Sequence, residues 1–253
     1  MIDLHSHLLP AVDDGSRSAA QSAGVLREMA KAGVTDVCLT PHLRAGEVAA
    51  GPPAKHEQAF EELMIAAPPM PRLHRGAEVM LDRPFPKDLG QVRRVTLGGT
   101  RFMLVEFPRM VAISSVTNAL TRIKEAGLLP IVAHPERYSC CTPSTVQRWR
   151  GLGAFMQLDA TTLFRSSARG VRVRELLEHG LGDIIAGDNH GDSRSVAAGF
   201  KFLVEQDGAL QADLLTVKNP GAILKEEPLQ PVPPLRIKQS LIQRLRVLLE
   251  GEE

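Results

Sequence analysis

The chain opens with MIDLHSHLLPAVDDG, residues 1–15, in which a short apolar run leads directly into two histidines and then into a loop with paired aspartates. His5 and His7 are separated by one residue, so at the end of a strand both imidazoles point to the same side. Two imidazoles on one side can chelate a single divalent metal ion. We therefore predict that this stretch contains the first strand of the fold and that a metal site lies at the end of that strand.

Further short apolar runs follow, and segments with apolar residues at three- and four-residue spacing lie between them. The runs predict seven strands, at residues 1–4, 36–39, 73–78, 102–106, 130–133, 155–158 and 184–186. The intervening segments predict helices at residues 18–32, 55–66, 115–126, 142–150 and 168–178. Three of these helices are expected to end at Gly33, Gly127 and Gly180. Alternating strands and helices predict an α/β fold with a parallel sheet.

The overall size and composition are those of a globular protein. A length of 253 residues suits either one (β/α) barrel, which commonly has about 250 residues, or two smaller domains. The net charge of +1 provides no global field that would recruit nucleic acid, so any preference for an anion must be created locally. No apolar stretch approaches the roughly eighteen residues of a membrane span, and the first residues lack a signal-peptide pattern. We therefore expect a cytoplasmic protein.

Titratable residues gather at the predicted strand ends. Parallel α/β folds collect their functional groups at the carboxyl ends of the strands, so this distribution predicts one shared site. The candidate metal ligands are His5, His7, Asp14, His42, Glu78, Glu106, His134, Asp188 and His190.

This set of ligands exceeds the coordination capacity of one ion, and a carboxylate such as Glu78 can bridge two cations. We therefore predict two or three divalent metal ions. Nitrogen and oxygen ligands without thiolate suit manganese (Mn2+), iron or zinc better than magnesium. Clustered divalent metals are suited to phosphoester hydrolysis, because they activate water and neutralise charge on phosphoryl oxygens.

Arginine and cysteine residues add two further hypotheses. Arg137, three residues beyond His134, is expected to bind the remaining phosphate oxygens through its planar guanidinium, with a surface salt bridge as the alternative. Cys38 and Arg44 have the five-residue separation of cysteine-based phosphotyrosine phosphatases. Pro41 between them, however, removes a backbone N–H that a phosphate cradle needs. We interpret Cys38 as a buried strand cysteine, and Arg44 as either a phosphate contact or a solvated side chain.

The C-terminal part of the chain differs in character from the rest. Residues 226–234 are proline-rich and are interpreted as a connector after a catalytic unit of residues 1–225. Residues 235–253 are predicted to form a basic amphipathic helix. Such a helix can dock on its own barrel or on a sister subunit, on a partner, or on an anionic lipid surface.

Six motifs carry a resemblance to a known family. They are MIDLHSHLLPAVDDG, TPH at 40–42, GAE at 76–78, VEFP at 105–108, AHPERY at 133–138 and GDNH at 187–190. In their order and spacing they resemble the polymerase and histidinol phosphatase (PHP) superfamily, specifically its bacterial branch of manganese-dependent protein-tyrosine phosphatases of capsule and exopolysaccharide systems. The resemblance spans residues 1 to about 225.

The resemblance implies a distorted (β/α)7 barrel and a role for each ligand. It places the first metal on His5, His7, Glu78 and Asp188, the second on Glu78, Glu106 and His134, and the third on Asp14, His42 and His190. It also implies that catalysis involves Arg137, His42, His190 and Asp188. The implied substrate is a phosphotyrosine-bearing protein, specifically a membrane-associated bacterial tyrosine autokinase that controls polysaccharide export.

Three other functions are compatible with the same residues. Histidinol-phosphate phosphatases share the superfamily and its metals. A phosphodiesterase or proofreading nuclease shares the fold, but a nuclease should have a basic track leading to its site, and no such run occurs outside the tail. A metal-stabilised scaffold without catalytic activity is the third alternative.

Overall fold

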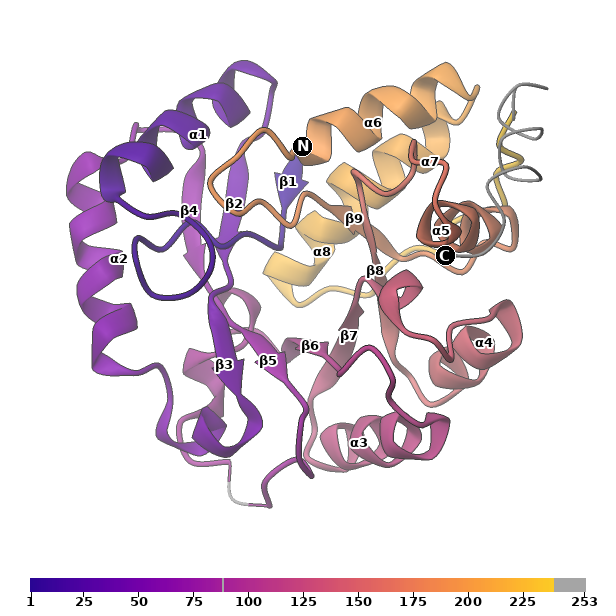
Figure 1. The fold of residues 1–253 in the computed structure, drawn as a ribbon, viewed down its shortest axis with the longest axis horizontal. Coiled ribbons are helices and arrows are strands. Elements are labelled where there is room, and N and C mark those ends of the chain that lie inside the picture. Colours follow the sequence, from indigo (N-terminus) through magenta and orange to yellow (C-terminus); the bar gives the residue numbers. More distant parts are fainter. Residues whose placement is uncertain (88, 239–253) are drawn as a thin grey trace.

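All strands run parallel and lie in two sheets (Figure 1). The computed structural model of the protein describes residues 1–87 and 89–238. The first sheet has the order β1-β2-β4, with β1 (Ile2–Asp3), β2 (Asp36–Leu39) and β4 (Arg72–Arg75). The second has the order β3-β5-β6-β7-β8-β9, with β3 (His42–Arg44), β5 (Glu78–Met80), β6 (Phe102–Glu106), β7 (Leu129–Ala133), β8 (Phe155–Asp159) and β9 (Ile184–Ala186). The predicted α/β fold with parallel strands is confirmed.

Two breaks carry the chain from the first sheet to the second. Thr40 and Pro41 separate β2 from β3, and Gly76 and Ala77 separate β4 from β5. Pro41 has no N–H to offer a strand ladder. At Gly76 an added β-carbon would lie only 3.1 Å from Leu97 and 3.3 Å from Thr40, so the neighbouring groups leave little room for a side chain. The prediction of one strand over 73–78 is therefore wrong, and β3 was not predicted.

The two sheets meet again at their other border. Ser6, beyond the end of β1, forms an isolated parallel bridge with Asn189, beyond the end of β9. The backbone N–H of His7 donates to the Asn189 carbonyl at 2.7 Å. The described strands therefore pair in two sheets with a bridge between them and not in one continuous hydrogen-bonded ring.

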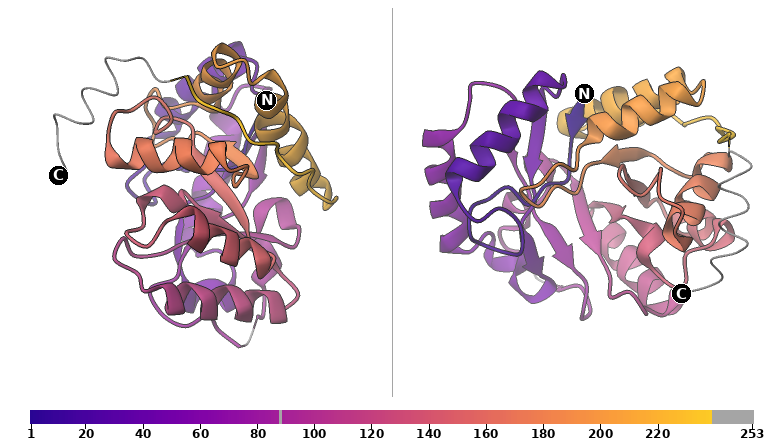
Figure 2. Two further views of the ribbon diagram at one scale, coloured as in Figure 1. Left: turned by 90° about the vertical axis from the view of Figure 1, so that its right-hand side faces the viewer. Right: turned by 45° about the horizontal axis from the view of Figure 1, so that its top comes forward.

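Helices surround the strands on the outside (Figures 1 and 2). The five predicted helices are present as α1 (Ala19–Lys31), α2 (Ala54–Ala66), α3 (Ile113–Glu125), α4 (Pro143–Gly151) and α5 (Ala168–Glu178). Ser18, Thr142 and Ser167 cap three of them, each accepting a backbone N–H of the first turn. Gly33 and Gly127, just beyond α1 and α3, adopt positive φ values of 89° and 78°, which glycine tolerates best.

The helices after β9 were not predicted. They are α6 (Val196–Glu205), α7 (Ala209–Asp213), a π-helical turn η5 (Leu214–Lys218) and α8 (Asn219–Lys225). Short 3₁₀ turns also occur in the loops, at η1 (Ala45–Ala50), η2 (Val92–Arg94), η3 (Leu97–Gly99) and η4 (Pro135–Arg137). Among the described residues no helix combines the length and the hydropathy that crossing a membrane requires.

The strands are buried on both faces. On β6, Met103 and Val105 belong to the larger apolar cluster, while Phe102 and Leu104 belong to a second, smaller one. Burial on both faces explains why the strands read as continuous apolar runs and not as alternating ones. Cys38 lies in the smaller cluster with no exposed surface, and this burial raises the pKa of its thiol. The alternative of a thiolate nucleophile at Cys38 is therefore excluded.

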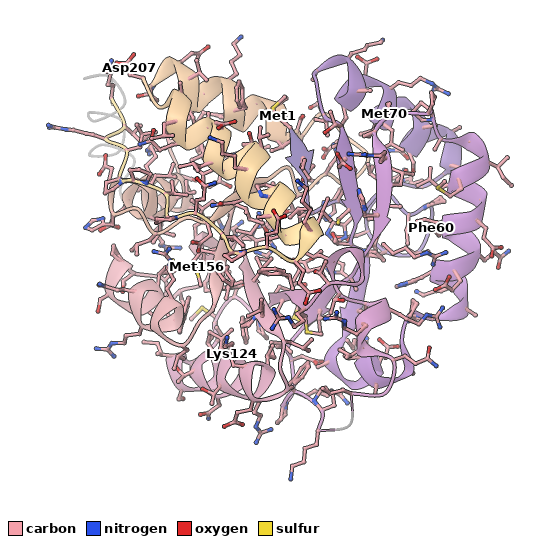
Figure 3. All side chains as sticks on the ribbon, turned by 180° about the vertical axis from the view of Figure 1, so that it is seen from behind. Met1, Phe60, Met70, Lys124, Met156 and Asp207 are labelled. Atoms are coloured by element: carbon pink, nitrogen blue, oxygen red, sulfur yellow. The ribbon has the colours of Figure 1, made fainter. Side chains whose placement is uncertain are left out.

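The segment after α8 packs on the protein without regular secondary structure as far as residue 238. Figure 3 shows α8 and this segment on the face opposite to that of Figure 1. Leu235 and Ile237 are 8% and 5% exposed, and the Leu235 N–H donates to the Leu177 carbonyl at 3.0 Å. These residues are therefore docked on the chain's own core. The rest of the predicted helix, residues 239–253, lies outside the described part of the chain.

Asn219 ties this segment to the core, and its replacement provides a test of the docking. Its buried side chain donates to the carbonyls of Asp183 and Gln230 and accepts the Gln230 N–H, each at 2.9 Å. We expect Asn219→Ala to lower the free energy of unfolding by about 2–4 kcal/mol, because buried partners lose their hydrogen bonds. Chemical denaturation measures this. The matched control Lys225→Ala, exposed on the same helix, should change it by less than about 0.5 kcal/mol. Equal effects of both changes would contradict the docking role.

Candidate metal centre

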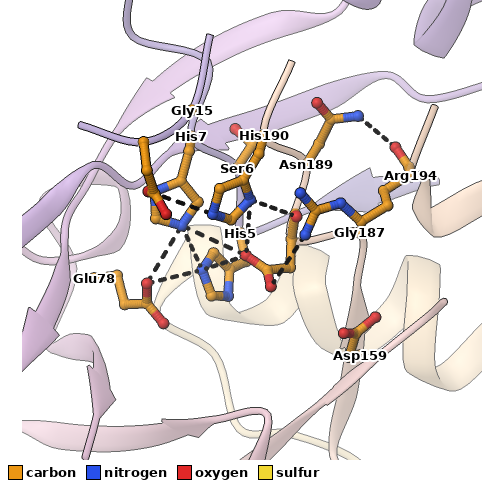
Figure 4. Close-up of polar contacts among 12 residues, drawn as sticks. His5, Ser6, His7, Gly15, Glu78, Asp159, Gly187, Asn189, His190 and Arg194 are labelled. Atoms are coloured by element: carbon orange, nitrogen blue, oxygen red, sulfur yellow. Dashed lines mark hydrogen bonds and ion pairs between the residues drawn. The ribbon is translucent and has the colours of Figure 1, made fainter. Parts of the chain in front are cut away.

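All nine predicted ligands converge in one region, and Figure 4 shows His5, His7, Glu78 and His190 among them. Their donor atoms fall into four overlapping groups, and within each group the atoms lie within 4.8 Å of one another. The groups are His7, Asp14, His42 and His190; His5, Glu78 and His134; His5, His7 and Asp188; and His42, Glu78 and Glu106. The shared members show that these are parts of one cluster and not four separate sites.

The two histidines of the opening stretch direct their Nε2 atoms at each other. The Nδ1 of His5 donates to the Gln157 Oε1 at 2.9 Å, and the Gln157 amide nitrogen in turn donates to the Leu158 carbonyl. The Nδ1 of His7 donates to the Asp13 carboxylate at 2.9 Å. In the neutral form of each ring the Nε2 therefore carries a lone pair, and the two Nε2 atoms are 3.1 Å apart. Such an arrangement needs a cation, either a proton or a metal ion, between the rings.

The backbone around these histidines is held by buried polar contacts. The Ser6 hydroxyl donates to the Cys38 carbonyl at 2.8 Å, which fixes the first strand end against β2. The Asp3 carboxylate accepts the N–H groups of Gly187 and His5. Gly15 passes so close to His7 that an added β-carbon would lie 2.0 Å from the His7 carbonyl oxygen. The loop after β1 therefore folds back over His7 only because residue 15 is glycine.

Glu78 occupies the centre of the cluster. Its Oε2 is 3.3 Å from the Nε2 of both His5 and His7 and 3.2 Å from the Nδ1 of His42. Its Oε1 is 2.8 Å from the Nε2 of His134. The prediction that Glu78 ends a strand is wrong, because it begins β5 and pairs there with His42 of β3. The pairing of β3 with β5 therefore places two ligands side by side on adjacent strands.

One edge of the cluster is open to solvent. His42 Nε2 and His190 Nε2 lie 3.4 and 3.5 Å from the Asp14 carboxylate, whose side chain is 69% exposed. The His190 Nδ1 donates to the Asp188 carbonyl at 3.0 Å. The lone pair on its Nε2 is therefore left for a metal ion. Burial and the neighbouring His7 lower the pKa of His190, which keeps this imidazole neutral. A substrate can therefore approach from the side of Asp14.

The electrostatics of the cluster fit divalent cations. Burial opposes charge on Glu78 and Asp188, yet the His5 imidazole holds the pKa of both carboxyl groups below its usual range. Burial likewise opposes protonation of His42, yet the adjacent Glu106 and Glu78 raise its pKa to about 10. Among the described residues, Glu106 Oε1 and Asp188 Oδ1 are buried without a hydrogen-bond partner. Nitrogen and oxygen donors of this kind suit manganese, iron or zinc.

Arg137 lies at the border of the cluster. It ends η4, which follows directly after His134. Its Nη2 donates to Asp159 at 3.1 Å and to the Asp188 carboxylate. Arg194 approaches the same Asp188 at 3.8 Å (Figure 4). Arg137 is therefore hydrogen-bonded to a candidate metal ligand. It does not form the isolated surface salt bridge that was the alternative.

The sequence analysis missed four residues that contact the predicted ones. Asp13 was overlooked, although it directly precedes the predicted ligand Asp14 in the same loop. Asp159 ends β8 and obeys the strand-end rule that found the other acids. Gln157 and Arg194 carry only a weak signal in the sequence. The four missed residues are Asp13, Gln157, Asp159 and Arg194. Arg44, by contrast, is exposed at the end of β3, and its backbone N–H donates to the Glu47 carboxylate.

Replacement of Asp13 tests whether residues that hydrogen-bond to the candidate ligands affect the affinity for metal. We expect Asp13→Ala to weaken manganese binding by about 10- to 100-fold, because His7 loses the acceptor that fixes its tautomer and orientation. Calorimetric titration with Mn2+ measures the affinity. Glu28→Ala, which removes an exposed carboxylate paired with Lys31, is the matched control and should leave the affinity unchanged. Unaltered binding in Asp13→Ala would show that His7 is not a ligand.

Metal binding should also be linked to pH. In the metal-free protein, neighbouring carboxylates raise the pKa of His5, His7 and His42, so these groups carry protons to a higher pH than usual. A metal ion displaces those protons, and its affinity must rise with pH until the pKa of His42, about 10, is reached. Calorimetric titrations in buffers of different ionisation enthalpy should report proton release. A binding enthalpy independent of the buffer would contradict this expectation.

Known proteins with similar sequence include two tyrosine-protein phosphatases. Tyrosine-protein phosphatase CpsB of Streptococcus agalactiae is 27% identical over 247 residues, covering 89% of this chain and 98% of the relative. Tyrosine-protein phosphatase YwqE of Bacillus subtilis is 25% identical over 248 residues, covering 94% and 97%.

Two solved structures share the fold. One comes from the work on YwqE of Bacillus subtilis and CpsB of Streptococcus pneumoniae, described as unique metal-dependent tyrosine phosphatases. It has a TM-score of 0.76 and 23% identity, and the match covers 94% of this chain and 100% of the other. The phosphotriesterase from Mycobacterium tuberculosis has a TM-score of 0.57 and 10% identity, covering 88% and 93%. The family model for capsular polysaccharide synthesis, CpsB/CapC, matches residues 1–225. The chain therefore belongs to the CpsB/CapC family.

Proposed function

We propose that this protein is a metal-dependent phosphomonoesterase that hydrolyses phosphotyrosine. The observation that carries the proposal is the convergence of the free Nε2 atoms of His5 and His7 with the carboxylates of Glu78 and Asp188, directly beside the guanidinium of Arg137. The curated relatives that span nearly the same length are named tyrosine-protein phosphatases, which supports the choice of substrate.

The contacts support three cation positions, with manganese as the preferred ion and iron or zinc as alternatives. The first set of ligands would be His5, His7, Glu78 and Asp188; the second Glu78, Glu106 and His134; and the third Asp14, His42 and His190. Ligand atoms at about 2.0–2.2 Å from one ion lie at most about 4.4 Å apart. The longest contact used within the second set, 3.9 Å between His134 and Glu106, satisfies this limit. Glu78 would bridge the first two positions.

Arg137 is the residue proposed to hold the phosphoryl group. Asp159 and Asp188 engage its Nη2, so the other guanidinium N–H groups remain available to phosphoryl oxygens. The bound metal ions would supply activation of water and neutralisation of the charge that develops on phosphorus oxygens. Phenolate, with a pKa of about 10, leaves with less help from a general acid than an alkoxide. This difference favours an aryl phosphate as the substrate.

The two sheets are proposed to act as one distorted (β/α)7 barrel. β3 continues β2 after the Thr40–Pro41 break, and β5 continues β4 after the Gly76–Ala77 break. With each interrupted pair counted as one strand, the nine strands reduce to the seven expected from the sequence. The smaller apolar cluster would be the barrel interior, since it combines residues of both sheets.

The family supports a biological setting for the activity. A capsular polysaccharide family suggests that the substrate is a membrane-associated bacterial tyrosine autokinase acting in capsule or exopolysaccharide synthesis and export. We place the protein in the cytoplasm, where such a kinase would present its phosphotyrosines. The basic residues 235–253 are proposed to aid contact with the kinase or the adjacent membrane, and an oligomer is compatible with this arrangement.

An assay of the metal-reconstituted protein tests the proposal. With Mn2+ we expect hydrolysis of a phosphotyrosine peptide to exceed that of histidinol phosphate and of a bis-aryl phosphodiester. His134→Ala should lower kcat by about 10²-fold or more, because a proposed metal ligand is lost and with it the stabilisation of charge on the reacting phosphate. His179→Ala, at the exposed end of α5, is the matched control and should retain full activity.

Three results would overturn parts of the proposal separately. Preference for histidinol phosphate would reject the substrate, and preference for the diester would assign the protein to the phosphodiesterases. Equal activity of His134→Ala and the unaltered protein would reject the site itself.

A further inference from the structure

A cleft rich in arginine adjoins the metal centre. Its volume is about 770 Å³, and loops after β6, β7, β8 and β9 together with the start of α5 surround it. Six arginines line it against only two carboxylates, Asp159 and Asp192; the arginines are Arg109, Arg137, Arg165, Arg169, Arg172 and Arg194. The cleft is therefore strongly positive in a chain whose net charge is only +1.

The two carboxylates already have partners. Asp159 accepts from Arg137 and, through its other oxygen, from the N–H and hydroxyl of Thr161. Asp192 pairs with Arg194 at 2.9 Å. Neither carboxylate is therefore available to neutralise a further arginine.

Three of the arginines form no ion pair in the described part of the chain. Among residues 1–87 and 89–238, the side chains of Arg109, Arg165 and Arg169 form no ion pair or hydrogen bond, and Arg109 and Arg165 are exposed. Glu136 acts on Arg169 only at longer range. Exposed arginines without an ion pair also occur elsewhere, for example Arg27 and Arg148. The cleft differs from the rest of the described surface because it gathers six arginines around one cavity.

The first turns of α5 add to the positive potential. Backbone N–H groups at the start of a helix favour anions and disfavour cations. This helix nevertheless has no acidic residue in its first turn and instead carries Arg169 and Arg172 there. Burial, together with Arg137 and Arg109, lowers the pKa of Arg169. A bound anion would relieve this crowding of like charges.

The cleft and the metal centre share side chains. Arg137 lines the cleft and also contacts the candidate ligand Asp188. Arg194 does the same from the loop after β9, and Figure 4 shows Arg194 and Asp159 beside the histidine cluster. An anion in the cleft would therefore lie next to a phosphoryl group held by Arg137.

We infer that this cleft is a second anion-binding subsite, which recognises a carboxylate or phosphate on the substrate peptide beside the phosphotyrosine being hydrolysed. Arg109, Arg165 and Arg169 supply the unpaired guanidinium groups, and their planar donors match both anions. This inference rests on the proposed phosphotyrosine phosphatase function. It adds that the enzyme prefers acidic or multiply phosphorylated segments over isolated phosphotyrosines in neutral surroundings.

Peptides that differ only in their flanks test the inference. The metal-loaded protein is assayed with phosphotyrosine peptides of equal length that carry neutral flanks, acidic flanks or a second phosphotyrosine, and with para-nitrophenyl phosphate. We expect kcat/KM for the anionic peptides to exceed that for the neutral peptide by about tenfold at low salt, the effect of two arginine contacts. Ionic strength of about 0.5 M should reduce the preference. The two anionic peptides show whether carboxylate or phosphate is favoured.

Charge-matched variants separate the cleft from general electrostatics. The double variant Arg165→Gln/Arg169→Gln should lose the preference, mainly through KM, while hydrolysis of para-nitrophenyl phosphate remains unchanged. The control Arg27→Gln/Arg148→Gln removes the same charge from exposed positions on α1 and α4 and should keep the preference. Equal loss in both variants would assign the effect to net charge and reject the subsite.

The remaining outcomes are also decisive. If the unaltered protein hydrolyses the neutral and anionic peptides equally well, the inference is wrong while the proposed function stands. If no phosphotyrosine substrate is hydrolysed, the proposed function fails and the inference fails with it. If a labelled single-stranded oligonucleotide binds, loses affinity in the cleft variant and no peptide preference exists, the cleft belongs to nucleic acid and the inference is overturned.

Discussion

The buried carboxylate of Glu78 is the group on which the rest of the site depends. It is 1% exposed and faces imidazoles of His5, His7, His42 and His134, which come from three different segments of the chain. A buried carboxylate without positive partners is costly, and imidazoles without a shared cation would direct lone pairs at one another. The strands must therefore pair in a register that keeps the Glu78 carboxylate and these imidazoles close enough to bind the same metal ion.

That register is kept across two interruptions of the strands. Leu39 pairs with Arg75 before the breaks and His42 pairs with Glu78 after them, at the same offset along the chain. The break at Gly76 lets the chain leave one sheet and start the next with Glu78 as its first residue. Pro41 makes the matching break before His42, and the N–H of Glu78 donates to its carbonyl at 3.1 Å. The two irregularities thus interrupt the ladder without moving His42 and Glu78 out of register.

Much of this arrangement follows from the sequence, because parallel strands bring their ends to one edge and the ligands occupy those ends. The interruption at Gly76 could not be predicted, since an apolar run carries no mark of which sheet it joins. Asp13 and Asp14 could not be distinguished either, because the direction of each side chain depends on a loop folded around Gly15. The helices after β9 were not predicted either, although Pro220 lies in the first turn of α8, a position that tolerates proline.

Arg137 connects these constraints to substrate binding. Because guanidinium offers five donors, its Nη2 can engage Asp159 and Asp188 and still leave donors for a phosphate. Its position also joins the ligand cluster to the arginine cleft, because Arg137 contacts Asp188 and lines the cleft. A chain with a net charge of only +1 has no long-range attraction for anions. Selectivity for a negatively charged peptide must therefore arise from this local concentration of arginines next to the ligands of the proposed metals.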